Sequence, residues 1–164
     1  MKTITTIISF FFITLSFAQN NETKKAFAII KGEKFLIIGD TLKLKSTMLQ
    51  LVMDDNSGKV KLSVQVVKSQ TIGEAVKNYY YVLLQDKEKN VMIAKWLEKE
   101  NDELFMLNDF NGENYWQVLT TACIGTGDCT PQVAIIDSKM NWVCGHALVC
   151  KIDSTCKKVS AILD

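Results

Sequence analysis

The sequence contains no arginine. All 19 basic residues of the 164-residue chain are lysine, and 18 acidic residues balance them. Arginine is the side chain that binds phosphates bidentately and reads guanine edges, and nucleic-acid-binding domains carry clustered positive charge. We therefore do not expect a nucleic acid as partner.

Long hydrophobic runs are also missing, except for one at the start of the chain. This run covers residues 7–15, follows Lys2 and precedes the small residues Ser16 and Ala18. That order is typical of a secretory signal peptide. A run of about ten residues is too short for a transmembrane helix, which needs about 20.

We expect residues 1–18 to be removed, so that Gln19 begins an exported domain of residues 19–164 that does not span a membrane. No cysteine stands near the cleavage point, which argues against a lipid anchor. The expected location is therefore the periplasm, the cell envelope or the extracellular medium, as a soluble protein. Its length suits one domain. A boundary at residues 108–114 is an alternative.

Cysteine is absent from the first 122 residues, and all five cysteines lie in the last 42. In an exported protein, clustered cysteines predict disulfide bonds. We expect one turn between Cys123 and Cys129 and another between Cys150 and Cys156. Any one of the five cysteines can stay unpaired, and the other four can pair in three ways. Fifteen two-bridge patterns are therefore possible. The disulfide candidates are Cys123, Cys129, Cys144, Cys150 and Cys156.

Catalytic and metal-binding motifs are scarce. There is one histidine, His146, and no C-x-x-C pair of a redox enzyme. Structural zinc ligands usually lie two to four residues apart, whereas five or more residues separate successive cysteines here. We expect no enzyme activity, metal or cofactor. The alternative is a small secreted metal-binding protein or thiol enzyme that uses Cys144, His146 and Cys150.

Short strand-like runs separated by turns predict a mainly β fold. We expect a single antiparallel domain, either a meander with a barrel-like form or a sandwich, with its C-terminal third held by disulfides. A capping-box spacing from Thr71 to Glu74 predicts at most one short helix, over residues 71–77. The predicted strands are 26–30 and 35–38 as a hairpin, 42–53 with a β-bulge, 60–66, 79–85 and 91–98 as a second hairpin, 103–107, 115–124, 133–136, 147–152 and 159–163.

Aromatic residues offer the remaining candidates for binding. Tyr80, Trp116, Trp142 and His146 are the selected positions, although aromatic side chains more often fill a β-sheet core. The predicted function is a non-enzymatic module that binds a protein, peptide or glycan or supports the cell envelope. A further alternative is a secreted inhibitor or effector that presents the loop Gly125–Asp128.

Overall fold

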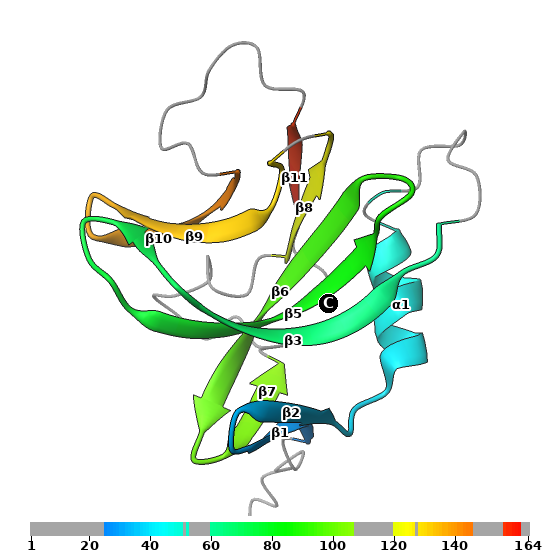
Figure 1. The fold of residues 1–164 in the computed structure, drawn as a ribbon, viewed down its shortest axis with the longest axis vertical. Helices are drawn as coiled ribbons and strands as arrows, with labels where there is room; N and C mark the ends of the chain where they lie inside the picture. Colours follow the sequence, from blue (N-terminus) through cyan, green and yellow to red (C-terminus); the bar gives the residue numbers. More distant parts are fainter. Residues whose placement is uncertain are drawn as a thin grey trace, which may run out of the picture.

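The computed structural model describes residues 25–50, 52, 60–106, 120–126, 128–145 and 156–161. Within these ranges the chain forms eleven strands and one helix (Figure 1). The elements are β1 (Ala26–Lys31), β2 (Lys34–Ile37), α1 (Thr41–Leu49), β3 (Ser63–Gln70), β4 (Ile72–Gly73), β5 (Asn78–Asp86), β6 (Val91–Glu100), β7 (Glu103–Met106), β8 (Thr120–Ile124), β9 (Pro131–Ile136), β10 (Lys139–Cys144) and β11 (Lys157–Ala161). The predicted mainly β class is confirmed.

A large antiparallel sheet is organised around β6. One edge of β6 pairs with β5, and its other edge pairs with β8 over its first half and with β7 over its second half. The sheet continues outward through β3 beyond β5, β1 and β2 beyond β7, and β11 beyond β8. It curls into a half-barrel in which the edge strands β2 and β3 approach each other (Figure 1).

A smaller second sheet contains β10, β9 and β4 in that order. Strand β4 follows directly on β3 and pairs in parallel with β9, so the chain passes from one sheet to the other. The β9–β10 hairpin closes through Asp137 and Ser138, which both have positive φ angles of 51° and 60°. Two residues with positive φ match the twist of a tight hairpin.

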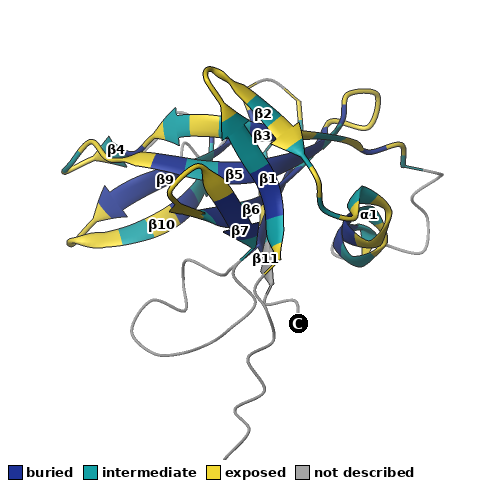
Figure 2. Cartoon of the chain, turned by 90° about the horizontal axis from the view of Figure 1, so that it is seen from below, coloured by how far each residue is buried: buried dark blue, intermediate teal, exposed yellow. Residues whose placement is uncertain are grey.

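The central strands β5 and β6 are buried on both faces, because their side chains alternate between two cores on opposite sides of the sheet. Tyr79, Tyr81 and Leu83 of β5 pack towards β9 and β10. Val82 and Leu84 lie on the opposite face, in a second core that includes residues of α1, β1 and β7. Figure 2 shows the buried residues concentrated on the central strands. The predicted hairpin of 79–85 with 91–98, buried on both sides, is confirmed.

The predicted strand and bulge over residues 42–53 are wrong, since residues 41–49 form α1. The Asp40 side chain accepts hydrogen bonds from the backbone nitrogens of Leu42 and Lys43, both at 2.9 Å, which caps the helix. Leu44 and Met48 are four residues apart and are buried together. A strand pattern and a helix pattern both place polar residues between the leucines. The Asp40 cap and the burial of Leu44 and Met48 favour the helix.

The predicted helix over residues 71–77 is also wrong. The Thr71 hydroxyl donates to the carbonyl of Ala75 at 2.7 Å and accepts from the nitrogen of Lys77 at 2.8 Å, which holds a loop. The Glu74 carboxylate accepts from the backbone nitrogens of the turn 137–138 at 2.8 and 3.0 Å. Both capping-box side chains are therefore occupied by contacts that a helix would not allow.

Two smaller differences concern strand boundaries. Residues 139–144, for which no strand was predicted, form β10. The predicted strand over 60–66 is shifted to 63–70, while the 26–30 and 35–38 hairpin is confirmed as β1 and β2. The predictions for residues 1–18, 108–114, 115–119 and 147–152 lie outside the described residues. Among the described residues, no helix is long and apolar enough to cross a membrane.

Two disulfide bonds hold the C-terminal third, as predicted. Cys123 of β8 bonds to Cys144 at the end of β10, and Cys129 before β9 bonds to Cys156 before β11. Neither bridge closes one of the short turns that accompany the 123–129 and 150–156 spacings. The bridges instead link the large sheet to the segments around the second sheet, because β8 and β9 pack close together.

Candidate binding site

A groove lies where the half-barrel stays open, between the hairpin β1–β2 and strand β3. It encloses about 390 Å³. In the described part of the chain, β2 pairs only with β1 and β3 pairs only with β5, so each carries one unpaired edge. The lining residues are Ile30, Gly32, Glu33, Phe35, Val66, Val67, Lys68 and Tyr80.

The predicted binding residue Tyr80 lies in this groove. Its ring meets the Phe35 ring edge-on, with centroids 6.1 Å apart. Its hydroxyl makes no hydrogen bond to the residues described here. Tyr80 pairs across the sheet with Lys68 of β3, and both side chains are on the face that carries the groove. The groove thus combines an apolar and aromatic floor with a phenol that has no hydrogen-bond partner in the described part of the chain.

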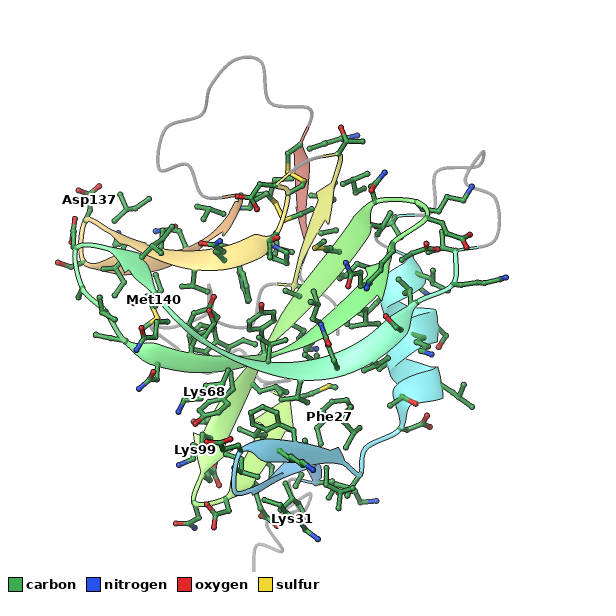
Figure 3. All side chains as sticks on the ribbon, in the orientation of Figure 1. Phe27, Lys31, Lys68, Lys99, Asp137 and Met140 are labelled. Carbon is green, nitrogen blue, oxygen red and sulfur yellow. A yellow bond between two sulfur atoms is a disulfide. The ribbon has the colours of Figure 1, made fainter. Side chains whose placement is uncertain are left out.

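Charges of both signs stand at the groove. Lys68 on β3 and Glu33 in the turn between β1 and β2 are both exposed. Figure 3 shows Lys68 on the side of β3 that faces the β1–β2 hairpin. A ligand that enters between the two edges would meet apolar side chains inside and charged groups outside, which is the usual composition of a binding pocket.

The other predicted binding residues do not join Tyr80. Trp142 of β10 is 5% exposed and packs edge-on against Tyr79 and Tyr81 between the two sheets, so it is a core residue. Burial raises the pKa of Tyr81 to about 12. Trp116 and His146 lie outside the described residues.

The thiol alternatives need Cys144 as a free thiolate, but its sulfur is bonded to Cys123. Cys150 lies outside the described residues. In the part of the chain that the structure describes, no three His, Cys, Asp or Glu side chains gather in a way that could hold a metal ion. The loop 125–128 is flanked by Cys123 and Cys129, both of which are in disulfides. Its role as an inhibitor or effector loop stays a prediction.

Sequence reasoning missed one unusual side chain, Lys95 in the middle of β6. It is only 5% exposed, and burial lowers the pKa of its ammonium group. The sequence did carry a signal for this exception, because Lys95 lies on the same side of the predicted strand as the apolar residues Val91, Ile93 and Leu97. A lysine at an inward position of an apolar strand is rare and indicates a functional or structural exception.

Comparison with known proteins gives no relative: no family model, curated protein or solved structure matches this chain.

Proposed function

We propose that the protein is an exported, non-enzymatic binding module that holds a short extended peptide segment in the groove between β2 and β3. The observation that carries this proposal is the groove of about 390 Å³ between two unpaired strand edges. Export rests on the N-terminal sequence, and two disulfide bonds are compatible with oxidising surroundings.

The unpaired edges of β2 and β3 favour an extended peptide over a compact ligand as the occupant of the groove. An unpaired strand edge presents backbone N–H and C=O groups, and an extended peptide can satisfy them by adding a strand. Strand β3 is eight residues long, which gives room for several such hydrogen bonds. Alternate side chains of the peptide would then point into the groove.

The lining residues define which peptide fits. Phe35, Val66 and Tyr80 would receive one apolar or aromatic side chain, and the Tyr80 hydroxyl would bond to a polar group of the peptide. Lys68 and Glu33 would contact charged residues next to it. The expected motif is therefore an apolar residue with an acidic neighbour on the Lys68 side.

The test is selection from a phage-displayed library of random linear peptides with the purified, oxidised protein, followed by calorimetry on the selected peptides. Lys68→Glu should weaken binding of peptides with an acidic neighbour by about tenfold, as expected for loss of one charge-assisted contact. Tyr80→Ala should weaken all of them.

Lys99→Glu is the matched control, because Lys99 is an exposed lysine of β6 that does not line the groove. Figure 3 shows both lysines. Lys68 is exposed, so its replacement leaves the core intact even if Tyr80→Ala destabilises the fold. Failure to select any peptide, or peptides that bind Lys68→Glu and Tyr80→Ala as well as the wild type, would contradict the proposal.

A further inference from the structure

The two edges of the groove between β2 and β3 run in opposite directions. Five successive antiparallel pairings connect β3 to β2 through β5, β6, β7 and β1. Because each pairing reverses the direction of the chain, β2 runs antiparallel to β3 across the groove (Figure 1). A single peptide strand between these edges must therefore run antiparallel to one edge and parallel to the other.

The two edges differ in length, and this difference favours one direction of the peptide. Strand β3 has eight residues (Ser63–Gln70), whereas β2 has four (Lys34–Ile37). Antiparallel ladders are slightly more stable per residue than parallel ladders. The larger gain comes from antiparallel pairing with the longer edge, which would place the N-terminal end of the peptide beside Gln70 and its C-terminal end beside Ser63.

Strand β3 contributes two different side chains to the same face of the groove. Val66 and Lys68 both line the groove, and side chains two positions apart on a strand lie on one face. Val66 is 9% exposed and belongs to the core shared with α1, β1 and β7, whereas Lys68 is exposed. The strand therefore presents an apolar position that is followed, towards its C-terminal end, by a cationic position.

We propose, on the basis of the peptide groove proposed above, that the bound segment carries an acidic residue two positions before an apolar or aromatic residue. In an antiparallel pair, the peptide residue opposite Lys68 precedes the one opposite Val66 by two positions, and opposite side chains share a face. The acidic side chain would contact Lys68. The apolar side chain would pack against Val66, Phe35 and Tyr80.

The reverse order of the two residues fits the groove less well. In the same direction along β3, it would place the carboxylate beside Val66, where its desolvation is costly, and the apolar side chain beside the exposed Lys68. A reversed peptide that turned round would restore these contacts, but it would pair in parallel with the eight-residue edge and be antiparallel only to the four-residue edge.

The experiment is calorimetric titration of the purified, oxidised protein with two synthetic peptides of identical composition. The forward peptide is acetyl-Thr-Thr-Glu-Thr-Phe-Thr-Thr-amide, and the reversed peptide is acetyl-Thr-Thr-Phe-Thr-Glu-Thr-Thr-amide. The wild type should bind the forward peptide about tenfold more tightly, because the reversed peptide loses either the contact with Lys68 or the longer antiparallel ladder. Lys68→Glu should abolish this preference, and the matched control Lys99→Glu should retain it.

The direction of the bound peptide is measured separately by NMR, with a nitroxide label at the N-terminus of the forward peptide. Strand β3 spans about 24 Å from Ser63 to Gln70, so the label distinguishes its two ends. It should broaden the amide signal of Gln70 more strongly than that of Ser63.

The outcomes separate this inference from the proposed function on which it rests. Equal or tighter binding of the reversed peptide, an unchanged preference in Lys68→Glu, or stronger broadening at Ser63 would overturn the inference and leave the peptide groove in place. Binding of neither designed peptide, when the random library does yield peptides that require Tyr80, would also overturn the inference alone. Binding of neither designed peptide together with an empty library selection would overturn both.

Discussion

Replacing both Cys123 and Cys144 by alanine should destabilise the protein strongly. The two residues are 21 positions apart, and the loop-entropy relation assigns a loop of that length about 3 kcal/mol at 25 °C. In the unfolded chain, the path from Cys123 to Cys144 through the second bridge, Cys129–Cys156, has a similar length to the direct path. The second bridge therefore does not replace the constraint that the first bridge imposes. Loss of the buried sulfur of Cys123 adds a smaller packing cost.

The effect is measured by urea unfolding of wild type and double variant under oxidising conditions. The variant should lose about 3 kcal/mol in free energy of unfolding, and its denaturant slope should rise because the unfolded chain expands. The matched control repeats both titrations in dithiothreitol, where the difference should shrink to the packing cost. A loss below about 1 kcal/mol, or a difference that persists after reduction, would refute the reasoning.

Two further predictions concern buried polar groups. Tyr79→Phe should cost about 1–3 kcal/mol in urea unfolding, because the backbone N–H of Val133 donates to the Tyr79 hydroxyl at 3.1 Å and would be left without that partner; an equal loss for Tyr80→Phe would contradict this explanation. Lys95→Met should stabilise the protein by about 1–3 kcal/mol near neutral pH, since desolvation of the Lys95 ammonium group on burial is costly. The folded-state pKa of Lys95 is lowered, so the unfolded state binds more protons between that pKa and about 10.4, and the advantage of Lys95→Met should shrink as pH rises through that window. A pH-independent difference between the two proteins would exclude this cause.

Local sequence patterns predicted the correct secondary structure where the apolar positions and the turn residues agreed. The β1–β2 hairpin and the β5–β6 hairpin follow from alternating or continuous apolar runs with charged turns between them. Local pattern was misleading at residues 41–49 and 71–77. In the first, alternating leucines concealed a helix capped by Asp40, and in the second, a capping-box spacing served a loop. Local hydrogen bonds of Asp40 and Thr71 combine in these segments with tertiary contacts, which are the burial of Leu44 and Met48 in the core and the bonds of Glu74 to the turn 137–138.

Two aromatic residues that were selected for binding lie in different surroundings in the structure. Tyr80 was selected from the sequence as an aromatic residue for binding, and the structure places it in a groove. Trp142, selected for the same reason, packs in the core. Nothing local distinguishes the two aromatic residues, because their exposure depends on which sheet covers them. The groove partners Phe35 and Val66 come from different strands, so no sequence motif could unite them.

By itself, the sequence determined the mainly β class, the two central hairpins and the presence of disulfides among five late cysteines, because these follow from local periodicity, turn residues and composition. Only the tertiary structure decided which cysteines bond, since Cys123 and Cys144 meet where β8 of one sheet approaches the end of β10 of the other. It also decided that the Glu74 carboxylate accepts hydrogen bonds from the backbone of Asp137 and Ser138, because folding brings together residues 63 and 64 positions apart.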